Sequence, residues 1–170
     1  MSGGRALRIT VAGCRGGAAY AVLWGGDLVR LGEVALPECA GDPGVQLAAL
    51  VMALVDAARL RAPRVEITAP GAVAIAAKRS IAGLPLSRGP VAEAWSAHRD
   101  IVLAVLERFE SWEIREGDDL DPTYTMLERL CERAAARAPP RRDRAVAALV
   151  CTGPLSELQE RAVLGEGVRL

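Results

Sequence analysis

The stretch from Val45 to Leu60 constrains the fold of this chain most. It contains neither Gly nor Pro, and only Gln46, Asp56 and Arg59 interrupt an otherwise apolar run. A run of this length and composition predicts a helix. Because a helix that is apolar on nearly every side is buried on most of them, other elements must pack around it.

Three short runs typical of β-strands precede this helix, and glycine-rich turns join them. The runs are Leu7–Ala12, Ala18–Trp24 and Leu28–Val34. Short strands joined by such turns predict an antiparallel meander. The Gly25-Gly26 pair between the second and third runs suits a hairpin turn that requires positive φ.

The element after the long helix indicates how the sheet is built. Val65–Thr68 is the next expected strand, and a strand that follows a helix directly implies a crossover that places it parallel to Leu7–Ala12. Asp121 followed by Pro122 is a favoured helix start. The remaining expected elements are a short helix at Ala72–Arg79, a helix at Val91–Glu110, a strand at Ser111–Glu116 and a last helix from Pro122 to about Ala138.

The length and charge of the chain limit its organisation and partners. The 170 residues fit one domain, which we expect at 1–138, with a C-terminal extension at 139–170 packed on it or on a partner. The 21 basic and 21 acidic residues cancel. A strongly basic nucleic-acid binder is therefore disfavoured, because phosphate binding needs a local excess of positive charge.

Composition also predicts the cellular setting. An Ala- and Arg-rich sequence with one lysine indicates a GC-rich bacterial coding sequence. Neither a signal peptide nor a membrane span is apparent, so we expect a soluble, cytoplasmic protein. Four cysteines occur with no CxxC pair, which predicts buried thiols in a reducing cytosol rather than a zinc site; they are Cys14, Cys39, Cys131 and Cys151.

Four local segments add detail to the order β-β-β-α-β-α-α-β-α. The first is Val11–Tyr20, a strand that enters a glycine-rich hairpin, and the second is Val45–Leu54, the start of the long helix. The third is Val65–Pro70, the end of a strand, and the fourth is Trp112–Cys131, the last strand with the helix that follows it. In this order they resemble the ribonuclease H family over most of the chain. The resemblance implies an α/β fold with a mixed five-stranded sheet, followed here by the C-terminal extension.

The residues expected at the active site depart from that family. Ribonuclease H cleaves the RNA strand of an RNA/DNA hybrid with two Mg²⁺ ions, which three or four carboxylates hold. The corresponding positions are Ala12, Gln46 and Ala69, and only Glu128 keeps a carboxylate in register. The resemblance thus implies a degenerate site, a pseudoenzyme, with no metal or other cofactor.

Basic residues provide the sequence signal for nucleic-acid contact. The candidates lie in the hairpin, beside the short helix and after the last helix: Arg15, Lys78, Arg79, Arg88, Arg141 and Arg142. The segment from Arg133 to Arg144 is basic enough to contact phosphates, and it would serve equally well as a solubilising linker.

Three other features have a simpler structural interpretation. Asp118, Asp119 and Asp121 could form a small metal site, but a solvated loop closing on a helix cap is favoured. A lone His98 in a helical stretch favours a packing or surface role over catalysis. Cys14 lacks a base in its own motif, which favours a structural thiol over a nucleophile.

These observations support a non-catalytic protein that works by binding. The leading hypothesis is a protein-interaction or assembly module whose partner is another protein or a second copy of itself, with Ala145–Leu170 in the contact. The alternative is a binder of RNA/DNA hybrid or duplex nucleic acid. A nuclease with a relocated metal site is the third hypothesis. A fold alone does not decide among them.

Overall fold

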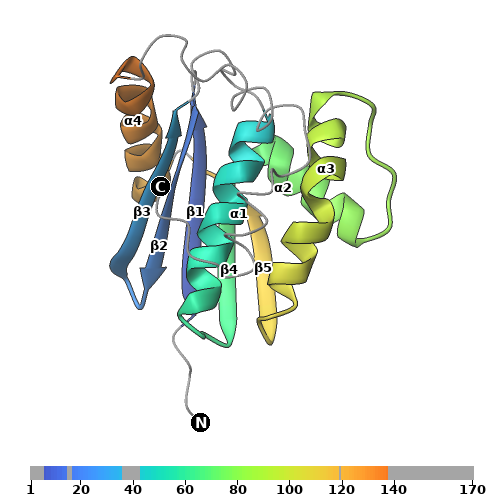
Figure 1. Cartoon of the computed structure of the whole chain (residues 1–170), viewed down its shortest axis with the longest axis horizontal. Coiled ribbons are helices and arrows are strands. Elements are labelled where there is room, and N and C mark those ends of the chain that lie inside the picture. The colour runs from blue at the N-terminus through green and yellow to red at the C-terminus, as the bar shows by residue number, and fades with distance from the viewer. Residues whose placement is uncertain (1–5, 15–16, 36–42, 119, 138–170) are drawn as a thin grey trace.

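A computed structural model of the chain describes residues 6–14, 17–35, 43–118 and 120–137 (Figure 1). Its five strands form one sheet in the order β3-β2-β1-β4-β5. The elements are β1 (Leu7–Cys14), β2 (Gly17–Trp24), β3 (Asp27–Ala35), α1 (Pro43–Arg59), β4 (Arg64–Ala69), α2 (Gly71–Ile81), α3 (Pro90–Leu106), β5 (Ser111–Glu116) and α4 (Pro122–Arg137). The chain therefore has the mixed α/β architecture that its sequence predicts.

The strand pairing confirms the expected topology. β1 pairs antiparallel with β2, and β2 pairs antiparallel with β3. β4 lies parallel to β1, with Leu7 beside Val65, and β5 lies parallel to β4. The turn between β2 and β3 has φ of 62° at Gly25 and 98° at Gly26, as a tight hairpin requires.

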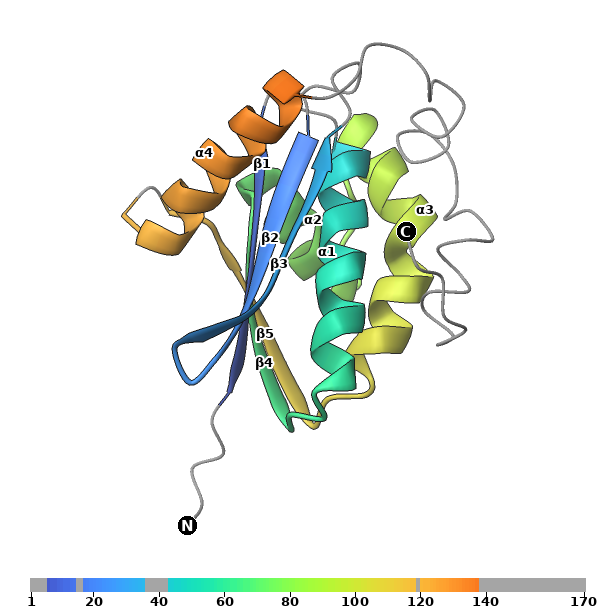
Figure 2. The same ribbon diagram turned by 60° about the vertical axis from the view of Figure 1, so that its left-hand side comes forward.

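Helices cover both faces of the sheet. Figure 2 shows α1 and α3 on one face and α4 on the other. α1 packs on β1 and β2 and against α3, while α4 packs on β1, β2 and β3. On the face that carries α4, β4 and β5 therefore lie beside the helix and not under it.

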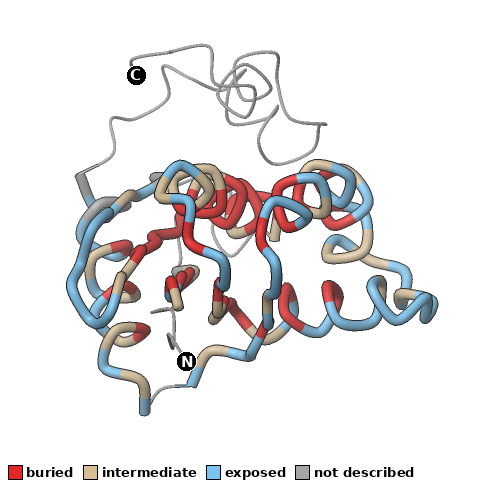
Figure 3. Tube along the Cα trace, turned by 90° about the horizontal axis from the view of Figure 1, so that it is seen from below, coloured by how far each residue is buried: buried red, intermediate tan, exposed pale blue. Residues whose placement is uncertain are grey.

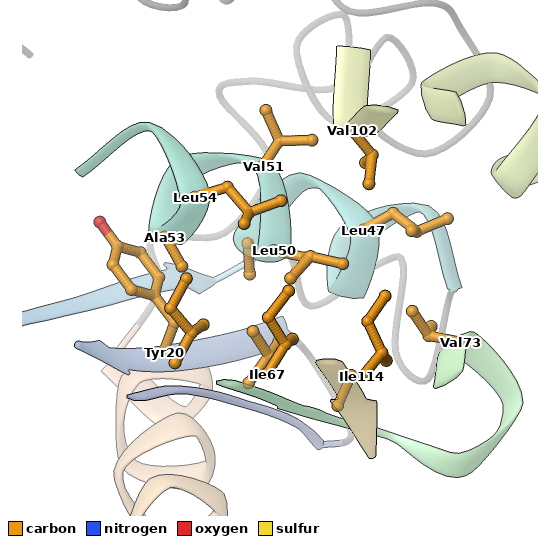
Figure 4. Close-up of a cluster of buried hydrophobic side chains, with 14 of the residues drawn as sticks. Tyr20, Leu47, Leu50, Val51, Ala53, Leu54, Ile67, Val73, Val102 and Ile114 are labelled. Atoms are coloured by element: carbon orange, nitrogen blue, oxygen red, sulfur yellow. The ribbon is translucent and has the colours of Figure 1, made fainter. Parts of the chain in front are cut away.

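The main core lies between α1 and the sheet. Leu50 and Leu54 of α1 belong to this core, and Figure 4 shows Leu50 above Ile67 of β4, which lies between Tyr20 and Ile114. The buried segments in Figure 3 lie mainly where the helices face the strands. A second, smaller cluster lies under α4: Ala12, Ala19, Ala21, Tyr124, Leu127 and Cys131.

One helix ends earlier than its sequence indicates. The predicted helix runs to Glu110, but α3 ends at Leu106. The next residues form tight turns, in which the N–H of Phe109 donates to the carbonyl of Leu106. These turns leave Phe109 only 6% exposed. The chain then enters β5, because the N–H of Glu110 donates to the carbonyl of Pro63.

No helix in the described part of the chain is long and apolar enough to cross a membrane. The expected extension at 139–170 lies outside the described residues, and so do Arg15, Cys39, Asp119, Arg141 and Arg142. The division into a domain and an extension stays a prediction.

Candidate functional site

Ala12 and Gln46 are brought to the same end of the sheet. Ala12 lies near the carboxyl end of β1 and is completely buried under α4. Gln46 lies in the first turns of α1, half-buried. Its side-chain amide packs so closely on Gly13 that a methyl group at Gly13 would collide with it. The folded chain thus places the Gln46 amide directly beside the residue that follows Ala12.

Ala69 is the last residue of β4, on the strand next to β1. Thr68 pairs with Thr10, so Ala69 lies at the same end of the sheet as Ala12. The two methyl groups face opposite ways, because Ala69 belongs to the core under α1 whereas Ala12 belongs to the cluster under α4. The carbonyl of Ala69 accepts a 2.7 Å hydrogen bond from the N–H of Gly117.

At the positions to which the sequence resemblance points, the side chains would not fit a two-metal centre. Mg²⁺ takes oxygen ligands, and the fully buried methyl groups of Ala12 and Ala69 supply none. Gln46 offers a neutral amide in place of a carboxylate. Glu128 is half-buried on α4 and is the one acid among the four positions. A single carboxylate does not balance two divalent cations.

A cleft of about 280 Å³ lies beside this region, where α4 leaves β4 and β5 uncovered. Glu66 and Thr68 face it, because they alternate along β4 with the buried Val65 and Ile67. Two arginines and four carboxylates line the cleft, a formal charge of 2 − 4 = −2. The charged lining residues are Arg8, Glu66, Arg115, Glu116, Asp118 and Asp121.

Two of the loop carboxylates are used to build backbone structure. Asp118 Oδ1 accepts a hydrogen bond of 2.9 Å from the N–H of Leu120. Asp121 Oδ1 accepts one of 2.8 Å from the N–H of Thr123, which caps the start of α4. The cap that the Asp-Pro start predicts is confirmed, and so is the structural role of these two acids.

Three of the other charged groups around the cleft, Glu66, Arg115 and Glu116, lie beside protein groups. Glu66 forms an ion pair of 3.3 Å with Arg64. Arg115 donates two hydrogen bonds to Glu113, at 2.9 and 3.0 Å, and these lower the pKa of that carboxyl group. The carboxylate of Glu116 lies near the first residue of α2, where the helix dipole favours a negative charge.

Two of the three basic candidates that the structure describes, Arg79 and Lys78, lie near protein groups. The guanidinium of Arg79 donates two hydrogen bonds, of 2.9 and 3.1 Å, to the carbonyl of Pro85. Lys78 lies close enough to Glu113 to contribute to its lowered pKa. Arg88 is exposed. Nucleic-acid contact by these residues and by Arg15, Arg141 and Arg142 stays a prediction.

His98 and Cys131 are both buried on helices. His98 is 2% exposed, and its Nδ1 donates to the carbonyl of Ala94 at 2.8 Å, which confirms a packing role. Burial lowers the pKa of His98. Cys131 forms a disulfide, so the prediction of free thiols is wrong for this residue. Spacing in the sequence gave no sign of it, because the chain brings the sulfurs together only on folding.

Two features that the sequence analysis missed have a recognisable signal. The cleft is lined by Arg8, Thr68 and Arg115, which alternate along their strands with buried residues. The second feature is Leu28 and Leu31 of β3, which are apolar and about half exposed. The alternation of side chains along a strand does not by itself tell an edge strand from a central strand.

Among the residues that the structure describes, no three His, Cys, Asp or Glu side chains form a group able to hold a metal ion.

Two solved structures resemble the chain over nearly their whole length. RNase H1 from the halophilic archaeon Halobacterium salinarum matches with a TM-score of 0.56 at 17% identity, covering 78% of this chain and 98% of that one. The N-terminal RNase H domain of a Mycobacterium tuberculosis protein, solved as a fusion with maltose-binding protein, matches with a TM-score of 0.54 at 14% identity, covering 77% and 95%. No family model and no curated protein matches the chain. The chain therefore has a ribonuclease H-like fold.

Proposed function

We propose that this ribonuclease H-like chain is non-catalytic and acts by binding, as an interaction or assembly module. The observation that carries the proposal is the pair of fully buried methyl groups at Ala12 and Ala69, where the resemblance would have metal-binding carboxylates. Gln46 supports it, because its amide packs on Gly13 as part of the core edge. A cytoplasmic location and a bacterial source stay predictions.

The charge of the cleft favours a protein partner over nucleic acid. A phosphate backbone needs a positive surface, whereas the cleft lining carries a formal charge of −2. Arg115 and Arg79 are also engaged by protein groups. The alternative, a hybrid- or duplex-binding protein, would have to use Arg88 and basic residues outside the described part of the chain.

A relocated nuclease site has little support in the same cleft. Three described acids of the cleft already have protein partners: Asp118 and Asp121 accept hydrogen bonds from backbone N–H groups, and Glu66 pairs with Arg64. Using them as metal ligands would remove the cap of α4 and the turn before it. The third hypothesis therefore ranks last.

The edge strand β3 is the surface that we assign to assembly. Its outer side has no neighbouring strand in the described sheet. Leu28, Val29 and Leu31 are 51%, 38% and 49% exposed. An exposed apolar edge offers unpaired backbone groups to another strand. Against such pairing the hairpin has an irregular register between Val22 and Leu23 and the charged residues Arg30 and Glu33 on β3.

A second copy of the chain fits this edge. Two β3 strands can pair antiparallel about a two-fold axis that passes through Leu31. Leu31 of one copy then lies beside Leu31 of the other, and Arg30 lies opposite Gly32 of the other copy. No like charges then face each other, whereas a register centred on Arg30 would oppose two arginines. The contact we predict from Ala145–Leu170 lies outside the described residues and is a separate prediction.

Two measurements test the proposed function. Incubation with a labelled RNA/DNA hybrid and Mg²⁺ or Mn²⁺ should give no cleavage above background. Sedimentation should show self-association of the intact chain that Leu31→Glu weakens. Leu84→Glu is a matched control, because Leu84 is 52% exposed but lies after α2 rather than on β3.

The contrary outcomes separate the hypotheses. Turnover that a single carboxylate substitution abolishes would establish a relocated nuclease site. A strict monomer that binds hybrid below micromolar concentration, with an affinity that falls steeply with salt, would establish the nucleic-acid binder. Equal effects of Leu31→Glu and Leu84→Glu on association would remove β3 from the interface.

A further inference from the structure

Cys131 is buried in the smaller apolar cluster, between α4 and the first two strands. It is 1% exposed and packs in one cluster with Ala12 of β1 and Ala19 of β2. It is disulfide-bonded, and no cysteine in the described part of the chain is free. The possible partners are Cys14, Cys39 and Cys151.

The backbone of β1 singles out one of these partners. Cys14 is the last residue of β1 and lies two residues after Ala12. Because residues two apart on a strand share a face, position 14 lies on the same side of the sheet as Ala12. Its pairing with Gly17 follows the pairing of Ala12 with Ala19, which already contribute to the cluster around Cys131.

We propose that Cys14 and Cys131 form a disulfide that fastens α4 to the end of β1. The bond forms when one thiolate attacks a low-molecular-weight disulfide and releases one thiol. The second cysteine then attacks the mixed disulfide and releases the other thiol. The small disulfide is reduced to two thiols, and the two cysteines are oxidised to the cross-link.

The proposed disulfide would stabilise the packing of α4 on the sheet. On the sheet side the cluster consists of Ala12, Ala19 and Ala21. Tyr124 and Leu127 supply most of the buried area, and this contact is smaller than the main core under α1. The cross-link closes a loop that contains every element between β1 and α4, and long loops are where a disulfide stabilises most. The fastened helix also carries Glu128 at the family site.

Disulfide mapping tests the pairing directly. The intact chain, equilibrated with oxidised glutathione, is unfolded under conditions that block free thiols and then digested without reductant. The expected product is a linked pair of peptides containing Cys14 and Cys131. A link from Cys131 to Cys39 or Cys151, or an alkylated thiol at Cys131, would overturn the proposal.

Matched variants measure what the bond does. Cys14→Ser and Cys131→Ser should each lower Tm by roughly 10 °C, and reductant should then change neither. Cys39→Ser is the control and should keep both the Tm and the response to reductant. Hydrogen exchange in α4 should speed up on reduction of the native chain. A Cys14→Ser variant that still loses stability on reduction would show that Cys131 has another partner.

Discussion

The side-chain amide of Gln46, at the start of α1, lies directly on Gly13 of β1, with no room between them for a methyl group. This contact joins the end of the first strand to the start of the long helix. It also places Gln46 where the family resemblance expects an acidic side chain. Substitutions at Gln46 therefore bear both on the packing against Gly13 and on the proposed loss of the metal-binding site.

Gly13→Ala should destabilise the fold by about 1 kcal/mol, because the added methyl group must displace the half-buried side chain of Gln46. Gln46→Ala removes most of that side chain, so the double variant should recover part of the loss. Urea denaturation of the four proteins gives the coupling energy. Additive effects of the two substitutions would mean that the contact does not limit the packing.

Ala12→Asp should cost about 3 kcal/mol or more at neutral pH, because it places a carboxylate in the apolar cluster with Leu127 and near α4. Ala12→Asn has almost the same shape without the charge, and it should cost less. Burial should raise the folded-state pKa of the new aspartate above its unfolded value. Its penalty should therefore shrink as the pH falls toward 4, and denaturation of both variants at several pH values would reveal this. Equal costs at every pH would mean that the site accepts a carboxylate.

Tyr20→Phe should cost about 1 kcal/mol, because the Tyr20 hydroxyl donates a 2.9 Å hydrogen bond to Asp56 of α1. Burial, then the charge of Asp56, raises the pKa of Tyr20 well above its ordinary value. An unfolded chain releases this proton above about pH 10 while the folded chain keeps it, so this contribution is lost as the pH rises. The stability gap between wild type and Tyr20→Phe should narrow in alkali.

His98→Gln should reduce the loss of stability in mild acid. Burial lowers the pKa of His98 in the folded chain, so below about pH 6.5 the unfolded chain binds a proton that the folded chain does not. The wild type should lose stability as the pH falls from 7 to 5, and the variant should lose less over the same range. Guanidinium titrations at each pH would measure the difference. Parallel curves would show that His98 titrates normally.

The sequence by itself determined the order of the elements and most of their limits. The apolar run of α1, the Gly25-Gly26 turn and the Asp121-Pro122 start are local signals, and each produces its element through backbone or burial preferences that act over a few residues. The β1–β4 pairing followed as well, because a crossover helix leaves few other places for the next strand. The absence of carboxylates at Ala12 and Ala69 is also a property of the sequence.

Tertiary structure decided what depends on contacts between distant segments. The Gln46–Gly13 contact, the disulfide of Cys131 and the partners of Arg79 and Arg115 join groups whose approach no local pattern encodes. The early end of α3 is of the same kind, because Phe109 turns inward only when a core is there to receive it. Helix and strand preferences act between near neighbours, whereas burial and charge pairing depend on which elements meet after the chain has folded.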